Sequence, residues 1–341
     1  MPGKNIAVDL GTGSIKVFVE GKGIVLCHAN AISYVSGTDE IVAIGDSAKE
    51  MLERTPSSLE TVRPIKGGVI ADFSVMKEIL TAALEKVCKY YVFKPNVIIS
   101  APSSCTQLEK KSVIEVACCA GAGKVCVIDE PVASALGCAK NINRPFGTMV
   151  IDIGAGTSDI AVITMETVAY SSSLALGGDD FDEAICQYVR KEKDILIGHN
   201  SAETIKKTVG CADSVDEEIE MSQNGKDFIT GMPVTFSITS TEVKEALKDS
   251  VHILVSEIKK VLEETPPELH ADICTEGIIL TGASAKLRGL DKYLEEKIGV
   301  KVSVAADCEH TAVKGAGYAL KNIKNLEDNG YIFKMKEKEG R

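Results

Sequence analysis

The sequence predicts an α/β protein built from two similar domains with mixed β-sheets. Strands alternate with helices along the 341 residues, which is typical of α/β folds. One hairpin pattern also occurs twice, near the start of each half of the chain. At about 100–200 residues per domain, this length corresponds to roughly two domains with a sizeable core. We therefore expect two related domains that face each other.

The repeated pattern is an apolar strand that ends in Asp, a turn of small residues that begins with Gly, and a second apolar strand. It reads "IAVDLGTGSIKVFV" at 6–19 and "VIDIGAGTSDIAVI" at 150–163, so that Asp9 corresponds to Asp152. Hairpins are common, but a matched Asp-x-Gly pair at half-chain spacing is not. The match indicates an internal duplication.

Both turns have the composition of an anion site. Glycine lets backbone N–H groups approach a ligand, and consecutive N–H groups form an anion nest. Two facing turns would clamp a polyphosphate, with the two aspartates holding the waters of a bound Mg²⁺. Ordinary hairpin turns with a capping Asp are the alternative, which the matched pair disfavours. Hydroxyl donors are present in both turns, at Thr12, Ser14, Thr157 and Ser158.

The remaining elements follow from apolar spacing and from start signals. The predicted helices span 73–90, 106–120, 131 to about 140, 179–193, 241–264 and 287–298. Pro131 suits the first turn of its helix. The predicted strands span 96–100 and 124–128, and 276–284 is a strand that runs into a loop. Residues 141–147 form a linker, and we expect a polar, mobile tail from 327.

Two acidic positions at predicted helix starts have competing interpretations. Glu130 lies where a strand ends and a helix begins, so its carboxylate can orient or deprotonate a water that attacks a γ-phosphate. In isolation, an acid there is more often a helix-dipole contact. In "LALGGDDFDEAI", either Asp179 or Asp180 can cap a helix, and Gly178 with its neighbouring glycine can also approach a phosphate.

Two further segments also have both a ligand-binding and a purely structural interpretation. Glu203 and Lys206 lie three residues apart on one helix face, a spacing that favours a solvated ion pair over a nucleoside contact. The loop within 279–290, "ILTGASAKLRGL", suits a ligand contact, although tight packing of a strand on a helix also demands small residues.

Composition excludes several classes of function. The chain has 38 basic and 49 acidic residues and a net charge of −11, which argues against nucleic acid as a partner. No apolar run approaches the ~18 residues of a membrane span, and the N-terminus lacks a secretory pattern. The eleven cysteines contain no CxxC pair. They favour small buried residues in a reducing cytosol over zinc ligands or disulfides, as at Cys88, Cys118, Cys126, Cys138 and Cys186.

In this order, the segments resemble the actin/Hsp70/sugar-kinase ATPase superfamily. The closer resemblance is to the MreB family of bacterial actin homologues, rod-shape-determining cytoskeletal ATPases. It runs nearly end to end, through "VDLGTGSIKVFVEGKGIVL", "IDEPVASALG", "DIGAGTSDIAVI", "GGDDFDEAI", "IGHNSAETIKKTVG", "EGIILTGASAKLRGLDKYL" and "GAGYAL".

The resemblance implies an actin-like ATPase fold, in which two duplicated RNase H-like domains surround a nucleotide cleft. The first domain would span 1–143, with a small subdomain at about 31–68, and the C-terminal helix 312–326 would return to it. The second would span 144–311, with a small subdomain at about 179–241. A polar tail would follow at 327–341.

The resemblance also implies bound ATP and Mg²⁺, and a slow ATPase. Glu130 would position the hydrolytic water with help from Thr157, and Asp9 and Asp152 would hold the metal through water. The nucleotide-binding residues would be Gly11, Thr12, Gly13, Ser14, Gly154, Ala155, Gly156, Thr157, Gly178, Glu203, Thr204, Ile205, Lys206, Gly282, Ala283, Ser284 and Ala285.

The implied partners are further copies of the chain in filaments, the inner face of the cytoplasmic membrane and the cell-wall elongation machinery. The implied location is the cytoplasm at that membrane, and the function is maintenance of cell shape by organising wall synthesis. A small-molecule kinase and a chaperone-type ATPase of the same superfamily are the alternatives. The first would need a catalytic aspartate with a substrate set, and the second would need a further substrate-binding domain.

Three departures from the family pattern affect these expectations. Ala155 replaces the middle glycine of the second phosphate loop, and Gly282-Ala283-Ser284 replaces three glycines. A Cβ restricts positive φ, so either change is expected to weaken nucleotide binding or slow hydrolysis. The start "MPGKNI" cannot form an amphipathic helix. Membrane contact would then fall on "YYVF" at 90–93, unless this helix end packs against its own sheet.

Overall fold

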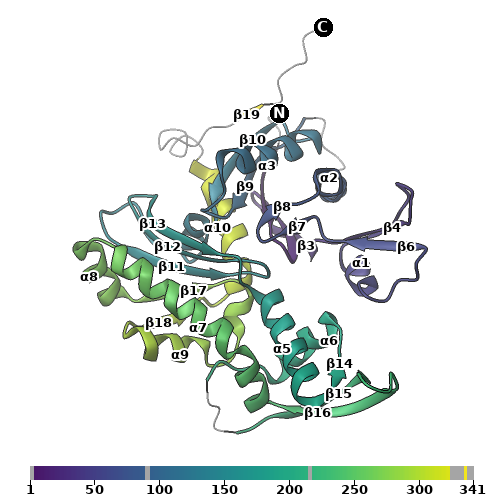
Figure 1. Ribbon diagram of the computed structural model, residues 1–341. Coiled ribbons are helices and arrows are strands. Elements are labelled where there is room, and N and C mark those ends of the chain that lie inside the picture. The colour runs from purple at the N-terminus through teal and green to yellow at the C-terminus, as the bar shows by residue number, and fades with distance from the viewer. Residues whose placement is uncertain (1–3, 89–92, 214–216, 323–333, 336–341) are drawn as a thin grey trace.

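Two large β-sheets organise the chain, one in each half (Figure 1). The computed structural model describes residues 4–88, 93–213, 217–322 and 334–335. The first sheet has the order β19-β10-β9-β1-β2-β3, and the second has the order β13-β12-β11-β17-β18. The strands of the first are β1 Asn5–Leu10, β2 Ser14–Val19, β3 Gly23–Ala29, β9 Asn96–Ala101, β10 Lys124–Asp129 and β19 Lys334–Met335. Those of the second are β11 Thr148–Ile153, β12 Ser158–Thr164, β13 Thr167–Leu174, β17 Ile278–Thr281 and β18 Val302–Val304.

The duplication predicted from the hairpins extends to the sheets. In each sheet three consecutive strands pair antiparallel with one another. A later strand then pairs in parallel with the first of the three, β9 with β1 and β17 with β11. The two aspartates occupy the same position near the end of the first strand, with Asp9 opposite Lys16 and Asp152 opposite Asp159. A parallel strand requires a crossover connection, which the helices provide.

Two short helices lie between the sheets. They are α4 (Glu130–Gly137) and α10 (Thr311–Ala319), and their apolar residues form one cluster with strand residues of both sheets, such as Ala7 and Val150. Glycine permits their close approach. A Cβ on Gly315 would lie 1.7 Å from the carbonyl oxygen of Ala133. This small-residue seam joins the two halves of the molecule.

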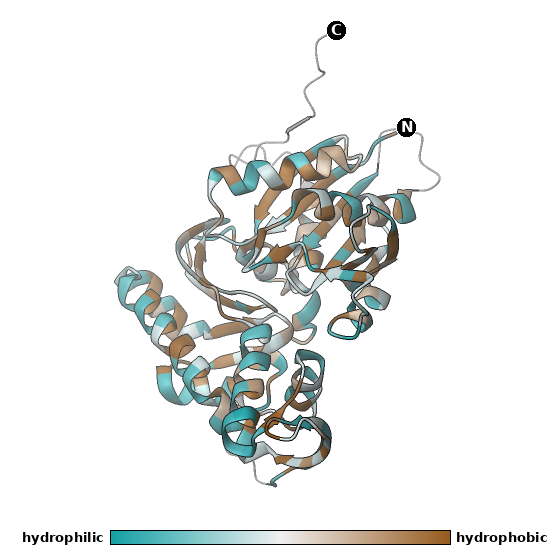
Figure 2. Cartoon of the chain, turned by 45° about the vertical axis from the view of Figure 1, so that its right-hand side comes forward, coloured by the Kyte–Doolittle hydropathy of each residue, from teal (hydrophilic) through white to brown (hydrophobic). Residues whose placement is uncertain are grey.

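Other helices cover the outer faces of the sheets. Helices α2 (Phe73–Cys88) and α3 (Gln107–Cys119) pack against the first sheet. Helices α5 (Gly178–Lys193), α7 (Ser240–Glu264), α8 (Pro267–Glu276) and α9 (Leu290–Ile298) surround the second. Figure 2 shows apolar strands inside and polar residues on the outward surfaces of the helices. This is the arrangement that the helical and strand periodicities predict.

Each half also has a smaller sheet. The first contains β4 (Ile32–Val35), β5 (Ile41–Ile44) and β6 (Leu59–Val62), with α1 (Asp46–Met51) beside it and the hairpin β7 (Ile65–Lys66) and β8 (Val69–Ile70) after it. The second contains β14 (Ile195–Leu196), β15 (Glu220–Asp227) and β16 (Pro233–Thr239), with α6 (His199–Val209). Several of these strands have only two to four residues, which is too short for a periodic signal. The domain limits themselves stay a prediction.

Several element ends differ from the sequence prediction. Helix α4 ends at Gly137 instead of about 140, and Ala139 then adopts a left-handed φ of 56°. Helix α9 begins at Leu290 instead of 287, because a 3-10 turn, η1 (Ala283–Lys286), and a left-handed Gly289 precede it. The expectation of a wholly mobile tail is wrong for Lys334–Met335, which pairs with β10.

Other expectations fall partly outside the described residues. Of the segment 90–93, only Phe93 is described, and it is 56% exposed. After α10 and the turn η3 (Leu320–Asn322), residues 323–326 of the expected C-terminal helix lie outside the description. Across the described ranges, no helix combines the length and apolarity needed to cross a bilayer.

The cysteines are free thiols, eleven in number. Of the five singled out from sequence, Cys118 and Cys126 are buried and the other three are partly exposed. The prediction of buried residues therefore holds for Cys118 and Cys126, and the other three are less buried than their apolar surroundings suggest.

Candidate functional site

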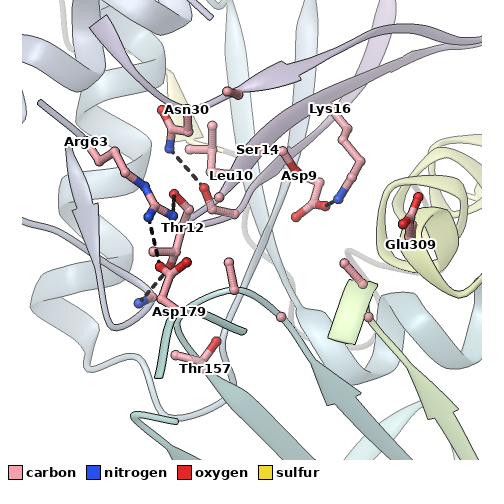
Figure 3. A pocket seen from close by; sticks show the side chains of 18 of the residues that line it. Asp9, Leu10, Thr12, Ser14, Lys16, Asn30, Arg63, Thr157, Asp179 and Glu309 are labelled. Atoms are coloured by element: carbon pink, nitrogen blue, oxygen red, sulfur yellow. Dashed lines mark hydrogen bonds and ion pairs between the residues drawn. The ribbon is translucent and has the colours of Figure 1, made fainter. Parts of the chain in front are cut away.

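A cavity of about 510 Å³ lies where the two hairpins meet, between the halves of the chain (Figure 3). Its size falls within the range of small-molecule sites. Its walls come from both hairpin turns, from α1 and α6, and from the start of α10. It therefore unites the segments that the sequence singled out.

The two turns have the same internal geometry and press against each other. In the first, the Gly11 N–H donates to the Ser14 carbonyl (3.0 Å), and in the second the Gly154 N–H donates to the Thr157 carbonyl (2.8 Å). A Cβ on Gly13 would lie only 2.8 Å from the Cβ of Ala155. Opposed turns of small residues let backbone N–H groups approach a ligand, and so they suit a polyphosphate chain.

Two buried aspartates form the floor of the cavity, each 5% exposed. Asp9 accepts from Lys16 Nζ (2.9 Å) and from Ser100 Oγ (3.1 Å). Asp152 Oδ2 accepts from the hydroxyls of Ser134 and Thr281, both at 2.7 Å. These bonds hold the carboxylates in place. Neither of the two hydroxyls donates to the other oxygen of Asp152, Oδ1.

The electrostatics of the floor are dominated by carboxylates. Burial raises the pKa of Glu130 well above its usual range, and the charges of Asp152 and Asp9 raise it further. Burial also raises the pKa of Asp152, against hydrogen bonds from its two hydroxyl partners that lower it. Burial lowers the pKa of Lys16, but the charge and hydrogen bond of Asp9 outweigh it and hold that pKa above the ordinary value.

This donor set fits a magnesium–polyphosphate ligand. Eight carboxylates and four Lys or Arg side chains line the cavity, so a polyanion alone would meet net repulsion. Asp9 and Asp152 offer the hard oxygen atoms that Mg²⁺ prefers. Among the described residues, no three His, Cys, Asp or Glu side chains cluster as a metal site. Mg²⁺ does not need such a cluster, because it is bound through waters, phosphates and one or two carboxylates.

The other end of the cavity contains a charged cluster on α6. Glu203 lies between Lys49 (2.7 Å) and Lys207 (2.8 Å). Burial raises the pKa of Glu203, but hydrogen bonds from Lys207 and Lys49 outweigh it and lower that pKa to about 2. The expected partner Lys206 instead pairs with Asp182 (2.8 Å). The predicted Glu203–Lys206 pair is therefore replaced by three others, Glu203–Lys49, Glu203–Lys207 and Lys206–Asp182.

Most of the predicted site residues line the cavity. These are Asp9, Gly11, Thr12, Gly13, Ser14, Glu130, Asp152, Gly154, Ala155, Thr157, Glu203, Gly282 and Ala283. Seven others do not line it: Gly156, Gly178, Thr204, Ile205, Lys206, Ser284 and Ala285.

The seven residues behind the wall have identifiable roles. Ser284 Oγ and the Gly178 N–H both donate to the Gly154 carbonyl (2.8 and 3.0 Å), and so they support the second turn. Gly156 packs on Thr12, and Lys206 donates to the Gly178 carbonyl. The side chains of Thr204, Ile205 and Ala285 point elsewhere than into the cavity. Ile205 and Ala285 are in the core, and the exposed Thr204 hydroxyl donates to the Asn200 carbonyl.

The two alanine departures carry no backbone strain. Neither Ala155 nor Ala283 has a positive φ, whereas Gly282 has a φ of 87°. A Cβ on Gly282 would lie 2.2 Å from the Ile153 carbonyl oxygen, so this glycine is the one that the loop requires. At the start of α5 the N-cap is Gly177, so the prediction that Asp179 or Asp180 occupies that position is wrong; Asp180, at the third helical position, instead accepts from the Gly177 N–H (2.7 Å).

Sequence reasoning missed all four cations of the cavity wall, which are Lys16, Lys49, Arg63 and Lys207. Lys16 alternates with the apolar residues of the first hairpin, so the strand periodicity could have predicted its position opposite Asp9. No local pattern in the sequence predicts Arg63 as a wall residue. Its guanidinium pairs with Asp179 (3.0 Å) and donates to the Thr12 carbonyl (3.0 Å), contacts that join segments far apart in the chain.

The fold and the site together define a two-domain protein of the actin-like class. A family model described as MreB/Mbl protein matches residues 3–328. The chain belongs to the MreB/Mbl family, which confirms the resemblance predicted from its segments.

Individual relatives agree with this assignment. The cell shape-determining protein Mbl of Bacillus subtilis is 40% identical over 324 residues, which cover 95% of this chain and 97% of that protein. The crystal structure of MreB5 of Spiroplasma citri bound to ADP has a TM-score of 0.92 and 32% identity, over 96% of this chain and 99% of that one. A MamK double helical filament shares the fold, with a TM-score of 0.78 and 22% identity over 93% and 99%.

Proposed function

We propose that this chain binds ATP with Mg²⁺ in the cavity, hydrolyses it slowly and polymerises into filaments. The observation that supports this most directly is the pair of opposed glycine turns above two buried aspartates. The ADP-bound relative has the same fold at 32% identity. The kinase and chaperone alternatives are less favoured, because the family match covers nearly the whole chain.

The proposed binding mode divides the cavity into two parts. The N–H groups of the two turns hold the phosphates, and Glu203 with the wall of α6 faces the adenosine. Asp9 and Asp152 would hold Mg²⁺ through bound water, and the metal would neutralise charge on the phosphate oxygens. The Lys16 ammonium contributes a second positive charge on the floor.

Hydrolysis would require a water placed between Glu130 and the terminal phosphate. The Glu130 carboxylate accepts a proton from this water, while the water oxygen bonds to the γ-phosphorus. The bond from that phosphorus to the β–γ bridging oxygen breaks, and ADP leaves with the bonding electrons. A raised pKa in Glu130 suits a base that works near neutral pH. Thr157 lies in the same wall and assists the placement of the water.

At the cellular level, we propose filaments in the cytoplasm at the inner face of the membrane, where they organise the wall-elongation machinery and maintain cell shape. The relative named cell shape-determining Mbl supports this role. Segment 90–93 is the proposed membrane contact, since Phe93 is an exposed aromatic residue. The domain limits given above belong to the same proposal.

The test is sedimentation of the purified chain with and without ATP·Mg²⁺, alongside phosphate release. We expect an ATP-dependent pellet and slow phosphate release, and electron microscopy on lipid should show filaments. Asp152→Ala should weaken Mg·ATP binding in calorimetry, whereas Glu264→Ala, an exposed acid on α7, should bind as the wild type does. An ATP-insensitive monomer that phosphorylates a metabolite would contradict the proposal.

A further inference from the structure

Asn30 is a buried polar residue of the cavity wall that the scheme above does not use. It directly follows β3, is 1% exposed and lines the cavity. Burying an amide side chain costs free energy unless its donors and its acceptor are hydrogen-bonded. The hydrogen bonds of Asn30 therefore indicate what role this side chain has.

Asn30 holds the first hairpin turn through two donors. Its side-chain Nδ2 donates to the Gly11 carbonyl (2.9 Å), and its backbone N–H donates to the Gly13 carbonyl (3.1 Å). The Thr12 carbonyl between them accepts from the guanidinium of Arg63 (3.0 Å). Three successive carbonyl groups of the turn are therefore held by donors that lie outside it.

These bonds determine the direction of two N–H groups. In a trans peptide unit, the carbonyl and the N–H of the next residue point in opposite directions, and the described residues contain no cis peptide bond. The bonds to the Gly11 and Thr12 carbonyls thus turn the N–H groups of Thr12 and Gly13 away from the donor side chains. Figure 3 shows Asn30 and Thr157 on opposite sides of Thr12. The two N–H groups therefore face the second turn, as successive donors of an anion nest.

The other end of the Asn30 amide adds nothing to the stability of the fold. The Gly11 carbonyl can only accept a hydrogen, so the amide nitrogen must face it and Oδ1 must point away. Among the described residues, this buried Oδ1 atom has no hydrogen-bond partner. A buried oxygen without a partner is destabilising, and an apolar side chain of similar size would avoid that cost. Fold stability therefore does not account for an asparagine at this position.

We propose that Asn30 is a positioning residue for phosphate binding, whose side-chain amide holds the Gly11 carbonyl and thereby aims the Thr12 N–H at the phosphate chain of the nucleotide. This role rests on the proposed binding of ATP. Asn30 acts through the turn and not through a contact of its own with the nucleotide. Its contribution to affinity therefore depends on the phosphates and not on the adenosine.

Ligands with and without phosphates test this dependence. Asn30→Leu roughly keeps the size of the side chain and removes the amide donor. In calorimetry with Mg²⁺ present, we expect the affinity for ATP to fall about tenfold or more, as the loss of a hydrogen bond to a charged group does. The affinity for adenosine should stay within about twofold of wild type. A merely structural role would weaken both ligands alike.

Two further variants complete the experiment. Asn30→Ala removes the same donor, should give the same difference between ATP and adenosine, and serves where Asn30→Leu fails to fold. Ser33→Ala is the matched control, because it removes another buried hydrogen bond close by in the chain, between Ser33 Oγ and Thr61 Oγ1 (2.8 Å), and neither residue lines the cavity. This control should bind both ligands as the wild type does.

Equal weakening of ATP and adenosine binding in the Asn30 variants would overturn the positioning role. Wild-type affinity for ATP in these variants would do the same. In both cases the wild-type chain still binds ATP, so the proposed function stays intact. A wild-type chain that binds no ATP would contradict both proposals together.

Discussion

Glu130 is placed by three local features at the junction of β10 and α4. It is the first residue of α4, a proline follows it in the first helical turn, and its side chain lines the cavity. Its acidic neighbours raise its pKa, with burial as the larger cause. The same side chain could have been a simple helix-dipole contact. Its position on the cavity wall favours the catalytic interpretation.

At the residue scale, we predict that Glu130→Ala leaves ATP affinity nearly unchanged and slows hydrolysis by about 10²-fold or more, the usual effect of a positioned base. Phosphate release and calorimetry measure the two quantities. Asp129→Ala is the matched control, since Asp129 pairs with Lys110 (2.6 Å) and does not line the cavity. Normal phosphate release in Glu130→Ala would remove Glu130 from the mechanism.

At the scale of elements, the contact between the two hairpin turns limits the size of the side chains that each turn can accommodate. The position of a Cβ on Gly13 lies 2.8 Å from the Ala155 Cβ, a distance that real Cβ atoms do not adopt. One methyl group therefore fits between the turns, and two do not. Ala155 thus takes the space that a second glycine would leave empty, without strain at its own φ.

This geometry predicts a reciprocal pair of variants. Gly13→Ala should push the turns apart and weaken nucleotide binding by about tenfold or more, since overpacking of this kind costs ~1–3 kcal/mol. Ala155→Gly should bind within about twofold of wild type. The double variant Gly13→Ala with Ala155→Gly should recover wild-type affinity in calorimetry. Persistent weakness of the double variant would show that the turns do not meet as described.

The sequence predicts the hairpins well because their signals are local. Alternation of apolar residues and a small-residue turn specify β1–β2 and β11–β12, and the repeat identifies Asp9 and Asp152. Helical spacing allows Lys207, four residues after Glu203, as its partner, but it could not predict Lys49, which comes from a distant helix.

The smaller elements and the wall residues were harder to predict because their signals are not local. Strands such as Ile195–Leu196 are too short for a period, and Arg63 meets Asp179 only in the folded chain. For Ile205, the helical position was right, but its side chain is in the core rather than in the cavity. Local patterns predict elements, whereas contacts between distant segments require the fold.

At the scale of the whole molecule, the two halves are joined at both ends of the cavity. Helices α4 and α10 join them at the floor. At the other end, residues of α1 and of the loops around β6 contact the starts of α5 and α6. The contacts are Lys49–Glu203 (2.7 Å), Glu53 Oε2 with the His199 N–H (2.9 Å), Asn200 Nδ2 with the Leu52 carbonyl (3.3 Å) and Arg63–Asp179 (3.0 Å).

These cross-cavity contacts are partly exposed and so individually weak, about 0–1 kcal/mol each, but together they bridge one end of the cavity, and we predict that they slow the release of a nucleotide. Lys49→Ala combined with Glu53→Ala should raise the dissociation rate of a fluorescent ATP analogue about fivefold in stopped-flow measurements. Added salt should accelerate release from the wild type more than from this variant, because screening weakens the same ion pairs. Glu50→Ala, which changes an exposed acid on the same helix, should release the analogue at the wild-type rate. Equal rates and equal salt responses in the wild type and the double variant would mean that the contacts do not control exit.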